Sequence, residues 1–428
     1  MTQDGERVAV EGDREDRISD LPRNVIDRIL ELLPVEDAAR TSILSRKWRY
    51  IWAMLPSLVL GYRFCKSFKW EESPFNFKEA VDNILLMHMG DIVKFVLDTR
   101  ALRLSLSAAI DRWMFYVTRN GVKELTLRVS SYHTYTLPSS IFNCSSLTKL
   151  TLFKCVFKPP NSFLGFQNLI TLCLQGATFV PTTSFCVIKA PRLASLTLDS
   201  CNGTQYLNIV SPGLESLYVS NSQWQCYPLL NCLINCKSLT VLKLECHDVV
   251  NNPKPNEKTT LEKLLVSLPA LEVLDLDSFF VELLSADVVP NGLPVTLNCL
   301  WHLLLNLDLG KMGLTSYVLQ LIKNSPNLSK LEIRVDGTSD DAETVMKYLD
   351  MPSCLERPLN NLEHVAINFF KSSKAELLFV KLLLSSTPYL LSMCIRQWAD
   401  IDVDIALELM RFRRASPRAE LFYSQQKT

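Results

Sequence analysis

The order of apolar and polar residues predicts a short amphipathic helix near the start of the chain. Pro22 suits a first helical turn, where its missing N–H is harmless, and Pro34 marks the end of the helix. Between them, apolar residues recur at helical spacing: Ile26, Ile29, Leu30 and Leu33. This spacing gives the helix one apolar face.

Two further helical pieces are expected directly afterwards. Asp37 begins the second, and Ser45 is placed to cap a third that carries Trp48 and Trp52 on one face. Three helices this short enclose too small an interior to bury all their apolar side chains. Some of the following are therefore expected to face a partner: Leu21, Ile26, Ile29, Leu30, Leu33, Val35, Ile43, Leu44, Trp48 and Trp52.

Most of the remaining chain repeats the pattern L-x-x-L-x-L-x-x-N/C. Complete copies start at Leu147 and Leu193, and degenerate copies share their phase. The central leucines at positions 125, 150, 172, 196, 217 and 242 lie 25, 22, 24, 21 and 25 residues apart. Leucine-rich repeats have a period of about 20 to 29 residues. Later copies, centred on positions 274, 303, 331 and 365, are further apart, which fits added helices such as 260–268 and 315–324.

Each repeat is expected to contribute one short strand whose alternate leucines point inward. No single repeat can bury them, so neighbours must stack into a curved solenoid with a parallel sheet on the concave side and helices or loops on the convex side. The predicted fold class is therefore α/β. Outward strand positions are mixed in charge and size, which suits protein recognition, and the candidate target contacts are Thr151, Thr171, Thr197, Tyr218, Lys243, Asp275, His302 and Glu332.

The pattern changes from about Leu359. This portion begins like another repeat at 362–367 and then predicts helices at 374–384 and 401–411. An open array needs a terminal unit that shields the apolar end of its last repeat. The segment 359–428 is therefore expected to be a cap.

Composition and charge exclude several classes of function. Lys+Arg and Asp+Glu are both 45, so there is no basic excess that would favour nucleic acid. The apolar stretch 377–391 is interrupted by Lys381 and Pro388 and is too short to cross a bilayer. Despite 13 cysteines, the charged N-terminus lacks the apolar core of a signal peptide. Reduced thiols and a cytoplasmic or nuclear location are expected.

The sequence contains no motif for catalysis, a metal or a cofactor. It lacks G-x-G-x-x-G, Walker-type and G-x-S-x-G runs. The set Cys226, Cys232, Cys236, Cys246 and His247 lacks the paired spacing of a zinc site. Cysteines such as Cys155 and Cys201 instead share a repeat position, where a side chain bonds the turn backbone. We expect neither an enzyme nor a cofactor.

Several short motifs stand together at the N-terminus. They are Leu21-Pro22, the Ile29-Leu30…Leu33-Pro34 helix, Asp37-Ala38-Ala39-Arg40-Thr41-Ser42 and Leu44-Ser45-Arg46-Lys47-Trp48-Arg49…Trp52. Together they resemble an F-box of the type found in plant F-box/leucine-rich-repeat proteins. The ending Arg414-Ala415-Ser416-Pro417…Ala419-Glu420 resembles the FBD region of the same family.

The resemblance implies a domain order and a function. The expected segments are a disordered arm at 1–15, a three-helix F-box at 16–54, a connector at 55–75, a solenoid at 76–358 and an FBD cap at 359–428. The F-box would dock onto a Skp-type adaptor and through it onto a cullin ubiquitin ligase. The repeats would hold an unknown target protein, so the chain would be a non-catalytic substrate receptor that binds neither nucleic acid nor membrane. The implied adaptor contacts are Leu21, Pro22, Ile26, Ile29, Leu30, Leu33, Val35, Trp48 and Trp52.

Other functions stay open at the level of sequence. In the main alternative, the chain is an interaction scaffold outside ubiquitination, and its F-box-like helices only cap the solenoid. A catalytic pocket on the concave face and a small-molecule co-receptor role are further alternatives, which the linear sequence neither supports nor denies.

Overall fold

The computed structural model describes residues 21–43, 48–68, 74–102, 106–130, 134–181, 184–222, 227–246, 255–285, 296–337, 342–355 and 357–426. The chain packs as two compact units, Met1–His133 and Thr134–Thr428. The first unit contains the predicted F-box and connector and the start of the predicted solenoid. The finer domain boundaries stay predictions.

The first unit begins with short helices that follow the apolar pattern. They are α1 (Arg23–Glu31), α2 (Val35–Arg40) and the 3-10 turns η1 (Thr41–Ile43), η2 (Trp48–Tyr50) and η3 (Trp52–Met54). The first two helices are confirmed, although the second begins at Val35 and not at Asp37. The prediction of one third helix is wrong, because Trp48 and Trp52 lie in separate 3-10 turns, and both indoles are buried in the same small core. Ser45, its predicted cap, lies outside the described residues.

The rest of the first unit alternates helices with parallel strands. The elements are β1 (Ser57–Leu60), α3 (Tyr62–Ser67), α4 (Pro74–Met87), β2 (Lys94–Asp98), α5 (Ser107–Arg119) and β3 (Glu124–Arg128). Within the segment predicted to be solenoid, β2 and β3 pair in parallel. The predicted connector at 55–75 contains regular structure, since β1 pairs with β2 and aligns buried Leu58 with buried Phe95.

Parallel strands stack side by side along the second unit. In sheet order they are β5 (Lys149–Phe153), β7 (Thr171–Gln175), β10 (Ser195–Asp199), β12 (Ser216–Asn221), β13 (Val241–Cys246), β14 (Val273–Leu276), β15 (His302–Leu307), β16 (Lys330–Val335), β17 (His364–Phe370), β18 (Ser392–Gln397) and β19 (Glu420–Gln425). Their central residues, from Leu150 to Val365, are at most 2% exposed. The predicted phase of the repeats is confirmed.

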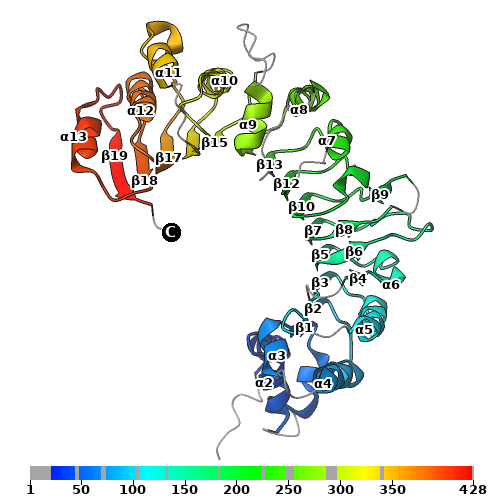
Figure 1. Cartoon of the computed structure of the whole chain (residues 1–428). Coiled ribbons are helices and arrows are strands. Elements are labelled where there is room, and N and C mark those ends of the chain that lie inside the picture. The colour runs from blue at the N-terminus through cyan, green and yellow to red at the C-terminus, as the bar shows by residue number, and fades with distance from the viewer. Residues whose placement is uncertain are drawn as a thin grey trace, which may run out of the picture. The chain divides into compact units, whose positions relative to one another are not determined.

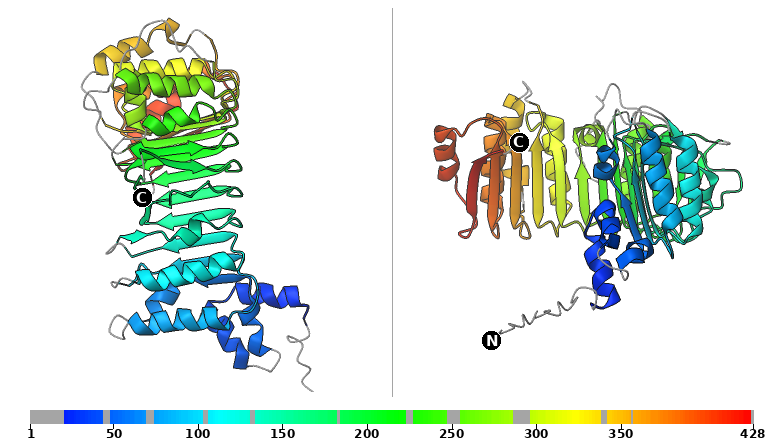
Figure 2. Two further views of the ribbon diagram at one scale, coloured as in Figure 1. Left: turned by 90° about the vertical axis from the view of Figure 1, so that its right-hand side faces the viewer. Right: turned by 90° about the horizontal axis from the view of Figure 1, so that it is seen from below.

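The opposite side of the second unit carries smaller elements and helices. They are β4 (Tyr135–Thr136), α6 (Ser139–Phe142), β6 (Cys155–Phe157), β8 (Thr178–Phe179), β9 (Cys186–Lys189), η4 (Thr204–Tyr206), β11 (Leu207–Val210), α7 (Tyr227–Leu233), α8 (Pro255–Ser267), α9 (Ser278–Ser285), α10 (Met312–Lys323), α11 (Ala342–Leu349), η5 (Pro352–Leu355) and α12 (Lys374–Ser386). Within this unit the main strands follow the inner side of a curve and the helices its outer side (Figures 1 and 2). The longer repeats carry the predicted helices, as α8 and α10.

The C-terminal segment continues the same sheet. β17 is followed by α12, β18 by α13 (Val403–Arg411), and β19 comes last. The helices predicted at 374–384 and 401–411 are confirmed. The segment therefore covers the preceding repeat with further strands, and its identity as a separate FBD cap stays a prediction.

Candidate protein-binding surfaces

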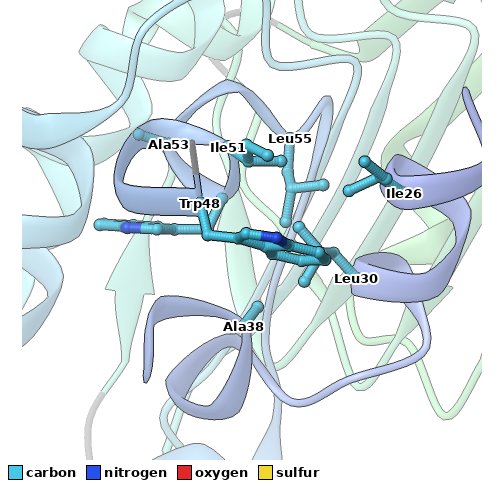
Figure 3. Close-up of a cluster of buried hydrophobic side chains, with 8 residues drawn as sticks. Ile26, Leu30, Ala38, Trp48, Ile51, Ala53 and Leu55 are labelled. Atoms are coloured by element: carbon cyan, nitrogen blue, oxygen red, sulfur yellow. The ribbon is translucent and has the colours of Figure 1, made fainter. Parts of the chain in front are cut away.

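The helices at the N-terminus enclose a complete but very small core. Its buried members are Ile26, Leu30, Ala38, Trp48, Ile51, Trp52, Ala53 and Leu55. Figure 3 shows the Trp48 indole at the centre, with Leu30, Ala38 and Leu55 around it. Ile84 of α4 packs against the same core. These helices are therefore joined to the elements that follow them.

Five of the predicted adaptor contacts are buried within the chain itself. They are Ile26, Leu30, Val35, Trp48 and Trp52, each at most 8% exposed. Leu21 is partly buried and packs against the same core. In the isolated chain these side chains hold the helices together, and they present little surface to another protein.

A second apolar face lies on the outer side of α1. The predicted contacts Pro22, Ile29 and Leu33 are exposed there. Sequence reasoning missed Val25 and Leu32, which follow the i, i+4, i+7 spacing with Ile29 and are 38% and 78% exposed. Ile43, at the end of η1, is 84% exposed. A domain this small that leaves this much apolar surface uncovered is suited to binding a partner.

Ion pairs on α1 involve the residues between its apolar faces. Arg23 Nε lies 2.8 Å from Asp27 Oδ1, one helical turn away, and Arg28 pairs with Glu31. Because these pairs lie at the surface, they add little stability. Their main effect is to keep the flanks of the exposed stripe polar.

The register of the second unit arranges the outward-facing residues of its main sheet in rows. The middle row runs Thr151, Cys173, Thr197, Tyr218, Lys243, Asp275, Leu304, Glu332, Ala366, Cys394 and Phe422. Six predicted target contacts belong to it. Thr171 and His302 instead lie one row away, aligned with Lys149 and Lys330 respectively. Both residues come directly before the central leucine of their repeat, Leu172 and Leu303, whereas the other six come directly after it, so the repeat phase separates the two rows.

Polar contacts join neighbouring strands near the centre of this surface. The Tyr218 hydroxyl donates a 2.7 Å hydrogen bond to Glu245 Oε2, and Lys243 Nζ lies 3.7 Å from Asp275 Oδ2. Asp275 is only 4% exposed, and this burial raises the pKa of its carboxyl against the opposing attraction of Arg334 and Lys243. The middle of the sheet is thus pre-organised.

Glu332 is held by two basic side chains. Its Oε1 lies 3.2 Å from His302 Nε2 and 2.6 Å from Lys330 Nζ. The hydrogen bond with His302, together with Lys330, lowers the pKa of Glu332 to about 2. The carboxylate therefore stays ionised at neutral pH and fixes the positions of both partners.

The repeat cysteines act as buried structural groups. The Cys155 thiol donates to the Phe153 carbonyl oxygen, Cys201 to the Leu174 carbonyl and Cys236 to the Ser211 carbonyl. Burial raises the pKa of Cys155 to about 12, so this thiol stays protonated and is a poor nucleophile. This confirms the predicted backbone bonding of Cys155 and Cys201, whereas Cys226 and His247 lie outside the described residues.

Among the residues that the structure describes, no three His, Cys, Asp or Glu side chains are grouped so that they could hold a metal ion. No helix among these same residues is both long and apolar enough to cross a membrane.

Comparison with known proteins matches two parts of the chain to known domain families. Residues 18–60 match the F-box domain, and residues 84–401 match the At1g61320/AtMIF1 LRR domain. The F-box/FBD/LRR-repeat protein At1g13570 of Arabidopsis thaliana is 31% identical over 97% of this chain and 100% of its own length. The FBD-associated F-box protein At5g38590 of the same plant is 28% identical over 79% of this chain and 83% of its own.

Proposed function

The chain belongs to the family of F-box/LRR-repeat proteins, and on that premise we propose that it is the substrate-receptor subunit of a Skp–cullin–F-box ubiquitin ligase. The F-box binds a Skp-type adaptor, and the concave sheet of the second unit binds a target protein. The role of the chain is to position the target protein, because tethering raises the effective concentration of the target beside the ubiquitin-carrying enzyme.

The exposed apolar face of α1 carries the first half of this proposal. Val25, Ile29 and Leu32 project away from the core that Trp48 and Leu30 fill. Burying such a face against another helix removes apolar area from water, at about 25 cal/mol per Å². The adaptor is the partner that this face would then contact.

An exposed-face variant tests this contact without disturbing the core. Leu32→Asp is expected to weaken adaptor binding by at least about tenfold, because it places a charge in the apolar interface. Leu86→Asp is the matched control, since Leu86 lies on α4 in the same unit and is 82% exposed. Equal co-purification of adaptor with both variants would contradict the proposal.

The concave surface of the second unit supports the other part of the proposal, the binding of a target protein. Its outward rows hold fixed polar side chains such as Tyr218, Lys243 and Glu332, and fixed groups cost less entropy on binding than mobile ones. Affinity purification under proteasome inhibition is expected to recover adaptor, cullin and ubiquitinated clients together. Recovery of clients without adaptor or cullin would instead favour the scaffold alternative.

One observation does favour that alternative, in which the helices only cap the solenoid. Ile84 of α4 packs on the F-box core, and the backbone N–H of Met89 donates a 2.7 Å hydrogen bond to the carbonyl of Ala53. Deleting residues 1–54 would thus remove part of the packing of α4 under either hypothesis. Point substitutions on the outer face of α1 discriminate better.

A further inference from the structure

The outward row nearest the carboxyl ends of the strands changes in charge along the second unit. Register aligns Asp199 of β10, Ser220 of β12 and Glu245 of β13. Further along, the same alignment gives Asn306, Arg334, Asn368 and Arg396 on β15 to β18. The row is thus acidic in its middle and basic toward its end.

The other two outward rows do not cancel this basic character. On β15 to β18 they contribute His302, Leu304, Lys330, Glu332, His364, Ala366, Ser392 and Cys394. With neutral histidines, Lys330 balances Glu332, and the two arginines leave a net charge of +2 over these four strands. We call these outward-facing residues of β15 to β18 the basic quarter; Figure 1 labels three of the strands that carry them, β15, β17 and β18.

The guanidinium groups of the basic quarter keep much of their donor capacity. Arg396 donates one 2.6 Å hydrogen bond to Asn368 Oδ1. Arg334 makes no hydrogen bond or ion pair within the described ranges, and it acts on Asp275 only through longer-range attraction. Since a guanidinium offers five N–H donors, both side chains can still bind an anion.

The acidic residue of the basic quarter, Glu332, and the buried Asp275 on the next strand are already engaged. Glu332 is held by His302 and Lys330, and buried Asp275 has Lys243 beside it. An incoming anion would therefore meet two guanidinium groups without first displacing a carboxylate from either of them. Charge complementarity at this place favours an anionic ligand.

We propose that the basic quarter binds an extended acidic segment of the target protein, in which two Asp or Glu residues at alternate positions contact Arg334 and Arg396. The two arginines stand two strands apart, or about 9.6 Å between backbones. Arg396 leans toward Asn368 on the intervening strand, which shortens the gap between the guanidinium groups. Alternate side chains of an extended peptide lie about 7 Å apart on one face, which matches this arrangement. The inference rests on the proposed function and specifies the chemistry of the target.

Peptide selection against the full chain in complex with its adaptor tests this preference. The probe is a displayed library of random 12-residue peptides, followed by synthetic peptides with Glu-x-Glu, Gln-x-Gln or Lys-x-Lys at their centre. Selected peptides are expected to be enriched in alternating Asp or Glu. The double variant Arg334→Gln/Arg396→Gln is expected to weaken Glu-x-Glu binding by about tenfold or more.

Two further variants sharpen the result. Lys149→Gln changes a basic outward residue on β5, far along the sheet, and is expected to leave binding within about twofold. Arg334→Glu/Arg396→Glu reverses the charge and is expected to turn the preference toward Lys-x-Lys. Absence of acidic enrichment, binding of Glu-x-Glu that ignores both arginine variants, or binding only of phosphoserine peptides would overturn the inference.

The failure of this inference can be separated from failure of the proposed function. If clients are lost on changing Tyr218 and Lys243 but not on changing Arg334 and Arg396, the concave surface binds its target and only the acidic-segment inference fails. If neither pair of changes affects client recovery, target binding by this surface fails as well.

Discussion

The carboxylate of Glu332 on β16 lies 3.2 Å from the Nε2 atom of His302 on the neighbouring strand β15. The two residues belong to different outward rows, so the contact runs diagonally across the sheet. Such diagonal contacts lock adjacent repeats together on the side where a target would bind. They make the surface rigid as well as polar.

The depressed pKa of Glu332 predicts a pH-dependent contribution to stability. Its folded value of about 2 lies below the ordinary value of 4.5, so the stabilisation is present above 4.5 and is lost as pH falls toward 2. Glu332→Gln should lower the free energy of unfolding by about 1 kcal/mol at neutral pH, after allowance for solvent screening. In urea titrations, the difference from the unaltered chain should shrink at about pH 3.

A matched control for this effect is available on α11. Glu343 pairs with Lys347 at 2.9 Å, but its side chain is 79% exposed. Glu343→Gln should therefore change the stability little at any pH. A Glu332→Gln difference that persists unchanged in acid would contradict the argument.

Trp48→Ala should unfold the N-terminal helices. The indole is 4% exposed at the centre of a core with few other members, so its removal is expected to cost about 3 kcal/mol or more. Limited proteolysis of the full chain should then cleave first within 21–55. The variant should lose adaptor binding through unfolding, whereas Leu32→Asp should lose it with the helices intact, as circular dichroism can show.

Joint truncation of Leu21 and Pro22 is expected to cost at least about 2 kcal/mol of adaptor-binding energy if these residues are anchors of the interface. Pro22 is exposed, while Leu21 also packs against the core. Titration calorimetry of Pro22→Ala alone and of the double alanine variant separates the two roles. Unchanged affinity in the double variant would remove both residues from the interface.

Gly203 should be intolerant of a side chain. Its φ of 72° lies in the left-handed region, and a Cβ there would come within 2.5 Å of the carbonyl oxygen of Phe179. Gly203→Ala should lower stability by about 2 kcal/mol. Gly313→Ala is the control, because Gly313 lies in α10 with its nearest neighbour 3.9 Å away, and it should be neutral or stabilising in thermal melts.

Some of the site was readable from the sequence but overlooked. The spacing of Val25, Ile29 and Leu32 is a second apolar stripe on α1, and it could have been found beside the stripe formed by Ile26 and Leu30. Asn327 and Asn361 are a second feature of the repeats that could have been recognised in the sequence. Each precedes the first leucine of its repeat and donates a side-chain hydrogen bond to a backbone carbonyl of the previous repeat, that of Asn298 and of Pro326.

The sequence by itself determined the stacked array. The leucines at alternate positions of each strand must be buried, so they fix which side of the strand faces inward. Because the repeats follow one another every 21 to 25 residues, each strand pairs with the strand of the next repeat. Only the tertiary structure decided that Trp48 and Leu30 fill the core while Leu32 faces solvent, since both stripes of α1 are apolar. It also decided that Arg334 and Arg396 share a row, because the strand that carries Arg396 has Met393 at its centre and does not show the leucine pattern of the other repeats.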